Sequence, residues 1–259
     1  DPPDQLLVIL AGDFVAPSLL SSIDAGRGMV ECLNAVGVTH VIFGNHEDDI
    51  SSEALRERVR EFAGTWINTN VTGFEPVLPR SQVRVVRARQ GGGRAVRVGL
   101  VGVVMNDPSV YRRPPFGVPS VAPANESARH EADRLVREER CACVIALTHQ
   151  PVQDDRALAR AQRDPPFPVI VGGHEHSPFA EQVEGTWISK SGADATHARI
   201  IDLRWPAEAP PSASATGVEL PAVSLAMERV ADYPEDPAVA ALVAKHQRRT
   251  DALRDATLL

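Results

Sequence analysis

Four short polar clusters contain the side chains of this sequence that could do chemistry. Each follows an apolar run, and together they supply carboxylate, amide and imidazole groups. The clusters are Gly12-Asp13, Gly44-Asn45-His46-Glu47-Asp48-Asp49, Thr148-His149 and Gly173-His174-Glu175-His176. Oxygen and nitrogen donors of these kinds bind hard and borderline divalent metal ions, and no cysteine lies among them. The donor set therefore indicates a metal site of the kind that supports hydrolysis.

The apolar runs before these clusters are predicted to be strands of an α/β sheet. Ligands of open α/β sheets bind beyond the carboxyl ends of the strands, so we expect the four clusters to meet there. Amphipathic segments between the runs predict helices, and the first strand, helix and second strand form a parallel, right-handed βαβ unit. The predicted strands are 6–11, 39–45, 66–71, 83–86, 96–103, 143–149, 168–171, 182–190, 197–205 and 218–229. The predicted helices are 26–38, 51–63, 125–140 with Asn125 as N-cap, 154–162, and a last helix that begins at Pro237 after an Asp236 cap.

Taken singly, these clusters are weak signals for a metal. An Asp or a His at the end of one strand caps a turn more often than it binds an ion. His174 and His176 are different, because two imidazoles two residues apart in an irregular turn converge for a purpose, and Gly173 beside them allows close backbone approach. The joint occurrence of all four clusters at strand ends favours the metal site.

Composition restricts the class of protein. At 259 residues and 43% hydrophobic residues, the chain can form one large α/β domain, although the length also permits two small ones. A net charge of −7 argues against a nucleic-acid or membrane-surface partner, and no apolar run approaches the roughly 18 residues of a membrane span. Three cysteines do not make a disulfide framework, so we expect buried thiols and a reducing compartment.

The four clusters resemble the second to fifth motifs of the calcineurin-like metallophosphoesterase superfamily. The segment Gly12 to Ser21, the pattern Gly44-Asn45-His46-Glu47-x-Asp49 and the segment Gly185 to Gly192 are similar to its 5′-nucleotidase branch in particular. The resemblance covers nearly the whole chain. It implies a four-layer αββα sandwich, with two mixed β-sheets flanked by helices and two divalent metals held between the sheets.

The resemblance also implies the metal ligands. Asp13 would bridge the two ions, Asn45, His149 and His174 would complete one site, and His176 would serve the other. A bridging carboxylate holds two cations close together, where they lower the pKa of a shared water and neutralise charge on the transition state. The donor set permits Mn, Zn, Fe, Co or Mg.

Catalytic and substrate-binding roles follow from the same resemblance. His46 would lie near the scissile phosphate as electrostatic stabiliser or general acid, oriented by Asp49, and Asn45 would contact the substrate with it. Glu47 and Glu175 are expected to be hydrogen-bond partners of the neighbouring histidines rather than ligands.

Two parts of the family pattern are absent from this sequence. The first motif, an Asp-x-His after an N-terminal strand, would precede Leu6, and Asp1 and Asp4 have no strand behind them. We expect a first strand upstream of the sequence given; the alternative is a one-metal or inactive relative. Family nucleotidases also carry a separate C-terminal domain that binds the nucleoside, and the final helix would lead to it.

The resulting hypothesis is a metal-dependent phosphoesterase. Residues 1–232 would form the catalytic domain and 233–259 an exit or linker helix. The activity would be hydrolysis of a phosphomonoester, a nucleotide if the 5′-nucleotidase resemblance holds, by attack of metal-activated water. The alternative is a catalytically impaired relative that binds a nucleotide or a protein without turnover. A structural zinc domain fits poorly, because such sites are usually rich in cysteine.

Overall fold

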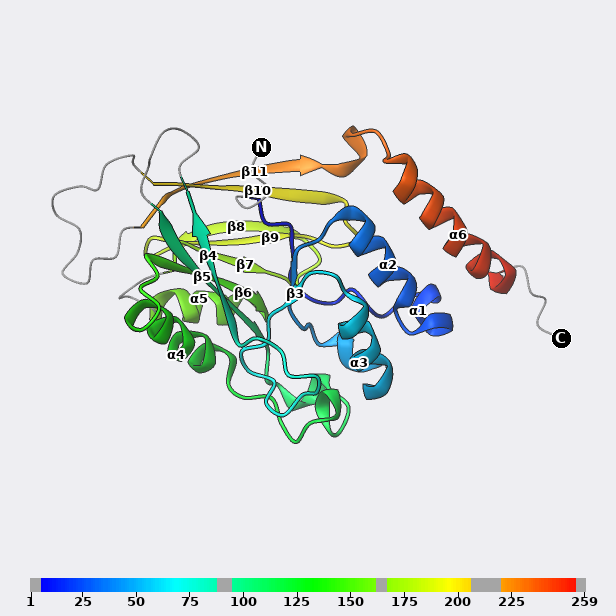
Figure 1. Cartoon of the computed structure of the whole chain (residues 1–259), viewed down its shortest axis with the longest axis horizontal. Helices are drawn as coiled ribbons and strands as arrows, with labels where there is room; N and C mark the ends of the chain where they lie inside the picture. Colours follow the sequence, from blue (N-terminus) through cyan, green and yellow to red (C-terminus); the bar gives the residue numbers. More distant parts are fainter. Residues whose placement is uncertain (1–5, 88–94, 162–166, 206–219, 255–259) are drawn as a thin grey trace.

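Two β-sheets form the centre of the computed structural model, which describes residues 6–87, 95–161, 167–205 and 220–254. The smaller sheet is parallel and has the order β1-β2-β3, from Ile9–Leu10, His40–Val41 and Thr65–Trp66. The larger sheet has the order β4-β5-β6-β7-β9-β8 (Figure 1). Its strands are β4 Ser81–Val86, β5 Val96–Val104, β6 Cys143–His149, β7 Val169–Gly172, β8 Pro178–Val183 and β9 Thr186–Ser191.

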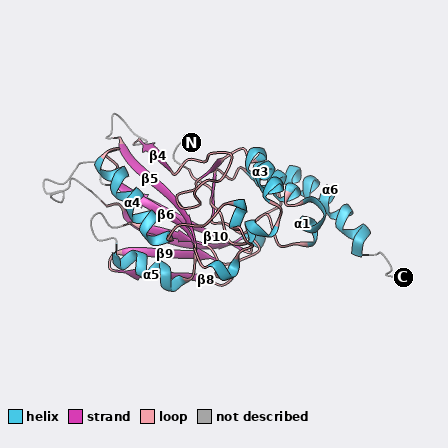
Figure 2. Cartoon of the chain, turned by 90° about the horizontal axis from the view of Figure 1, so that it is seen from below, coloured by secondary structure: helices cyan, strands magenta, loops and turns pink. Residues whose placement is uncertain are grey.

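Helices cover the outer face of each sheet (Figure 2). The smaller sheet is covered by α2 Arg27–Val36 and α3 Ser52–Glu61, with the short α1 Leu19–Asp24 before them. The larger sheet is covered by α4 Ala124–Arg137 and α5 Val152–Ala161. The expected four-layer αββα sandwich is therefore confirmed. In detail, only the larger sheet is mixed, since the described strands of the smaller one are all parallel.

The layers follow from the alternation of side chains along each strand. Val41 and Phe43 share a core with side chains of α2 and α3, whereas Ile42 between them shares a core with Leu100 and Leu147 of the larger sheet. The outer face of the larger sheet packs with α4 and α5 through Val101, Val103, Val144, Ala146, Ala128, Ala132, Leu135 and Leu158. The two sheets thus bury a shared core, and the carboxyl ends of their parallel strands supply the polar clusters.

Several strand predictions were wrong in extent: the predicted strands 6–11 and 39–45 are the two-residue β1 and β2, and two further cases have a visible cause. The predicted strand 66–71 is only a two-residue β3, because the chain then hydrogen-bonds to the larger sheet: Asn70 Nδ2 donates to Val104 O at 2.7 Å, and Val104 N donates to Asn70 Oδ1 at 3.0 Å. The predicted strand 182–190 is a hairpin of β8 and β9, whose turn at Glu184 and Gly185 has positive φ angles of 47° and 90°.

Helix starts were predicted with mixed success. Asp236 caps the last helix, α6 Pro237–Arg254, by accepting from the amides of Ala238 and Val239 at 2.8 and 3.1 Å. Asn125 is not an N-cap, because α4 begins one residue earlier; its Nδ2 donates to Asp154 O at 3.0 Å and so joins α4 to α5.

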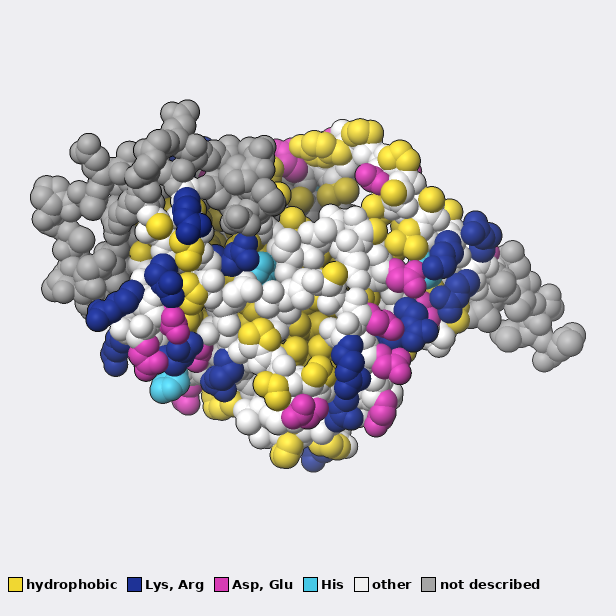
Figure 3. Space-filling view, viewed as in Figure 1, with side chains coloured by type: hydrophobic (Ala, Val, Ile, Leu, Met, Phe, Trp, Pro, Cys, Tyr) yellow, Lys and Arg dark blue, Asp and Glu magenta, His cyan; other side chains and the backbone are white. Residues whose placement is uncertain are grey.

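The end of the described chain lies along the helical layer of the smaller sheet. A two-stranded antiparallel ribbon, β10 His197–Arg204 and β11 Ala222–Arg229, leads into α6. α6 packs on α1 and α2, where Lys245 Nζ lies 2.9 Å from Glu31 Oε2. Acidic and basic side chains are interspersed on this surface (Figure 3). None of the helices in the described ranges has both the length and the apolar character needed to cross a membrane.

Candidate metal centre

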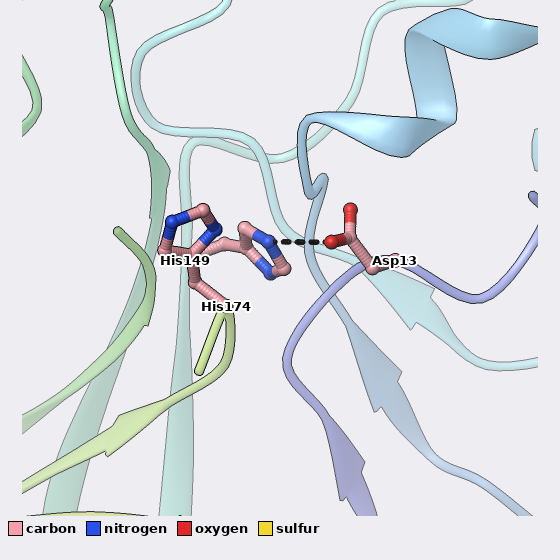
Figure 4. Close-up of side chains that lie close together, drawn as sticks. All are labelled: Asp13, His149 and His174. Atoms are coloured by element: carbon pink, nitrogen blue, oxygen red, sulfur yellow. Dashed lines mark ion pairs between the residues drawn. The ribbon is translucent and has the colours of Figure 1, made fainter. Parts of the chain in front are cut away.

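Asp13, His149 and His174 come together where the two sheets meet (Figure 4). One ligand atom from each side chain lies within 4.8 Å of the others. Asp13 follows β1 in the smaller sheet, whereas His149 ends β6 and His174 follows β7 in the larger sheet. Two sheets therefore supply the candidate ligands at the carboxyl ends of their strands, where the sequence places them.

The site has two parts, which we name by the sheet that supplies them. The first half-site is Asp13, Asn45 and His46, from the loops after β1 and β2. The second half-site is His149 and His174, from the ends of β6 and β7. The two parts are in contact, since Oδ2 of Asp13 lies 2.9 Å from Nε2 of His149. Within the first half-site, Oδ1 of Asp13 accepts from the backbone amide of His46 at 2.8 Å.

A fully buried carboxylate, Glu47, holds the first half-site together. It accepts from the backbone amides of Asp13 and Phe14 at 2.8 Å, of Val15 at 3.1 Å and of Gly44 at 2.5 Å. Burial and the charge of Asp13 raise the pKa of Glu47, and the amide donors oppose that rise. The expectation that Glu47 is a partner of a histidine was wrong: its oxygens are occupied by the main chain of the two loops.

Two glycines let the loops approach each other. A Cβ atom on Gly44 would lie 2.2 Å from Oδ1 of Asp13, and one on Gly173 would lie 2.2 Å from Ala11 O and 2.8 Å from Nδ1 of His149. These are distances that no side chain can occupy. Both positions therefore require glycine.

The second half-site presents two imidazoles. Nδ1 of His149 lies 2.6 Å from the carbonyl oxygen of Ala11, which can only accept, so Nδ1 carries a proton and Nε2 is the nitrogen that faces Asp13. Burial opposes protonation of His149, but the Asp13 carboxylate outweighs it and the pKa of His149 is raised. The His149 and His174 rings lie 5.4 Å apart in an edge-to-face arrangement. Burial and the neighbouring His149 lower the pKa of His174, which favours the neutral form that binds metals.

The donors at this site fit a divalent metal ion. Oδ1 of Asn45 is buried and has no hydrogen-bond partner within the described residues, and the buried Nε2 of His149 faces the Asp13 carboxylate at 2.9 Å. Leaving a buried polar atom without a partner costs about 1–3 kcal/mol. A cation beside Asp13 would bind both atoms, and the donor set contains only the oxygen and nitrogen ligands that such an ion accepts.

The predicted catalytic pair is present beside the cluster. Nδ1 of His46 lies 2.7 Å from Oδ2 of Asp49, within the short 3-10 helix His46–Asp49. Their side chains are 39% and 40% exposed, so a solute can reach them. Asp48 points the other way and accepts from the amides of Arg112 and Phe116, both at 2.5 Å. It thereby fastens the proline-rich loop to the turn that carries His46.

Two predicted residues lie apart from the cluster. His176 is exposed and is not part of the three-residue group found among the described residues. Glu175 accepts from the amide of Val152 at 2.6 Å and pairs with Lys190, so the expectation that it supports a histidine was wrong. Lys190 was missed as a site residue, although a lysine at the end of an apolar strand was a visible signal.

Comparisons with known proteins identify the family of this chain. The family model for calcineurin-like phosphoesterases matches residues 1–178. An apyrase from Tabanus yao is 27% identical over 146 residues, which cover 56% of this chain and 25% of that protein. The chain thus spans about a quarter of the length of this relative.

Two solved structures have the same fold. The sulfate thiohydrolase SoxB from Thermus thermophilus matches with a TM-score of 0.75 and 23% identity, over 94% of this chain and 42% of that one. A 5′-nucleotidase precursor from Thermus thermophilus matches with a TM-score of 0.73 and 19% identity, over 96% of this chain and 50% of that one. With the family model matching more than half of its residues, and with its fold and ligand cluster as described, the chain belongs to the calcineurin-like phosphoesterase family.

Proposed function

We propose that this protein is a metal-dependent phosphoesterase that hydrolyses a phosphomonoester. The observation that carries the proposal is the convergence of Asp13, His149 and His174 at the carboxyl ends of strands from two sheets. The family indicates a phosphoric ester hydrolase, and the buried Oδ1 of Asn45, which has no partner among the described residues, is a donor that a metal ion would use.

The chain's residues divide the work between holding metal and handling substrate. Asp13, Asn45, His149 and His174 would hold one ion, and His176 would contribute to a second that Asp13 bridges. Divalent ions at this place supply positive charge for the phosphate and lower the pKa of water. The ligands are mostly neutral, so they leave most of that positive charge for an anionic substrate.

His46 is the proposed stabiliser or general acid. Asp49 holds its Nδ1 at 2.7 Å, which fixes the ring and directs the opposite edge away from the carboxylate. The partial exposure of both side chains permits contact with a phosphate ester. Asn45 would contact the same substrate from the adjacent position.

A nucleotide is the substrate that we favour. The apyrase and the 5′-nucleotidase to which the chain is similar support a nucleotide, although the SoxB likeness shows that the fold also serves a protein named for another substrate class. We further propose that 1–232 is the catalytic domain and that 233–259 is a linker to a substrate-binding domain.

The second candidate is a relative that binds its ligand without turnover. The exposed side chain of His176 favours it, because Asp13 and His176 are the two ligands proposed for the second metal within the described residues. The first motif that would complete the second metal site stays a prediction, and residues 1–5 lie outside the described ranges.

One experiment separates these candidates. Metal content per chain is measured by elemental analysis, and p-nitrophenyl phosphate turnover is measured on the same sample with and without added Mn²⁺. We expect bound metal and Mn²⁺-dependent turnover, with the Asp13→Asn variant as the inactive control. Bound metal without turnover would support the binding module, and no metal under any condition would contradict the proposed centre.

A further inference from the structure

Lys190 is a buried cation next to the second half-site. Its side chain has 0% exposure, and it lies at the end of β9, where Lys190 pairs with Gly172 of β7. A buried ammonium is stable only when its three hydrogens find acceptors. The acceptors around Lys190 therefore show which parts of the chain it holds in place.

Two of the acceptors are backbone carbonyls. Nζ donates to Gln150 O at 2.7 Å and to Gly173 O at 2.8 Å. Gln150 directly follows His149, and Gly173 directly precedes His174. One ammonium group thus joins the main chain beside each of the two candidate ligands of the second half-site.

The other two partners are carboxylates that fix the same loops from outside. Lys190 lies 2.9 Å from Oδ2 of Asp155 and pairs with Oε2 of Glu175. The second oxygen of Glu175 accepts from Val152 N at 2.6 Å, and that of Asp155 accepts from Gln150 Nε2 at 3.0 Å. The network connects β9 and α5 to both loops, so neither loop can move without breaking a bond to Lys190.

We propose that Lys190 is a positioning residue that sets the separation of the His149 and His174 imidazoles and thereby the affinity of the metal centre. The inference rests on the proposed metal centre. Residues that orient the metal ligands without binding the metal themselves typically affect metal affinity by roughly 10–100-fold.

The competing explanation is that Lys190 only stabilises the fold. Arg58 of α3 provides a matched control, because it is also a buried cation, with a side chain that is 2% exposed. It donates to two backbone carbonyls, Asp24 O and Ala25 O at 3.3 and 3.2 Å, and to the carboxylates of Glu57 and Glu61 at 3.1 and 2.7 Å. None of these partners is adjacent to a residue of either half-site.

The test compares metal affinity and stability in the full chain. Wild type, Lys190→Met, Lys190→Met/Asp155→Asn and Arg58→Met are freed of metal with a chelator. The Mn²⁺ dissociation constant is then measured by calorimetry, and the unfolding midpoint is measured without metal. The double variant loses one charge of each sign, so the fully buried Asp155 is not left as an unpaired carboxylate, and Glu175 is 30% exposed and keeps its bond to Val152 N.

The direction of the change discriminates between roles. Removal of a positive charge near a cation site strengthens metal binding if charge alone matters. We expect the opposite, a dissociation constant raised roughly 10–100-fold in both Lys190 variants. Arg58→Met should lower the unfolding midpoint and leave the dissociation constant within about twofold of wild type.

Three results would overturn the inference. An unchanged or tighter dissociation constant in the Lys190 variants would remove the positioning role. An equal rise in Arg58→Met would reduce Lys190 to a general stabiliser. Wild type without Mn²⁺ binding would reject the proposed metal centre together with this inference, whereas binding by wild type and by the Lys190 variants alike would reject the inference alone.

Discussion

The first half-site is built around a buried carboxylate, and the second is built around a buried ammonium. Glu47 gathers four backbone amides from the loops after β1 and β2, and Lys190 takes two backbone carbonyls from the loops after β6 and β7. Loops that leave a sheet expose unpaired peptide groups, which must find partners when buried. The negative side chain of Glu47 accepts from backbone N–H groups that its loops leave unpaired, and the positive side chain of Lys190 donates to backbone C=O groups that its loops leave unpaired.

The two half-sites also differ in the chemistry of their own side chains. The first half-site carries the proposed anionic ligand Asp13 and the proposed acid His46, and the backbone amide of His46 donates to Asp13. The second carries only imidazoles, which are neutral as ligands. We therefore expect the first half-site to govern turnover and the second to govern metal affinity, and the following variants test that division.

Asp13→Asn should have the largest effect. Asparagine keeps the oxygen that accepts from the His46 amide at 2.8 Å but loses the charge that faces His149. Metal-dependent turnover of p-nitrophenyl phosphate should fall below detection, with little change in the circular dichroism spectrum. Retained turnover would exclude the bridging role and leave the two half-sites equivalent.

His46→Ala should lower kcat without removing metal. A positioned acid typically contributes roughly 10²–10⁴-fold to the rate. Elemental analysis and steady-state kinetics on the same preparation check this, with Asp48→Asn as a control for disturbance of the same turn. A loss of metal in His46→Ala would show that His46 is a ligand instead.

Glu47→Gln should act mainly through stability. The amide nitrogen of glutamine cannot accept, so some of the four backbone amides lose their partner. We expect the free energy of unfolding to fall by about 3 kcal/mol in urea denaturation. Compared with Lys190→Met, it should reduce kcat of the folded fraction more, and the reverse order would contradict the division between half-sites.

His176→Ala should have the smallest effect on structure and affect only the second metal. His176 is exposed and lies outside the described ligand group, so the fold should not depend on it. The ratio of metal to chain should fall from two ions to one, with the first ion retained. If the ratio in wild type is already one and stays one, His176 is not a ligand.

The sequence predicted which residues form the site better than it predicted the hydrogen bonds that hold them in place. Asp13, His149 and His174 could be placed together because each follows a buried strand, and parallel strands bring their carboxyl ends to one place. The partners of Glu47 and Glu175 could not be predicted, since they depend on how loops from separate strands bend toward one another.

The fold shows the same distinction. The alternation of Val41, Ile42 and Phe43 between two cores was readable from the sequence as a buried strand. The early end of β3 was not, because Asn70 leaves its own sheet to bond with Val104 of the other. The local hydrophobic pattern predicts that a strand is present, whereas the position at which it ends depends on contacts with the second sheet.

The close contacts of Gly44 with Asp13 and of Gly173 with Ala11 limit which amino-acid substitutions the protein can tolerate. At each position even the smallest side chain collides with the opposite loop at 2.2 Å. A library of all single substitutions, selected for activity, should therefore show intolerance at these two codons as complete as at the ligands. The spacing of the two loops therefore leaves both positions closed to any residue other than glycine.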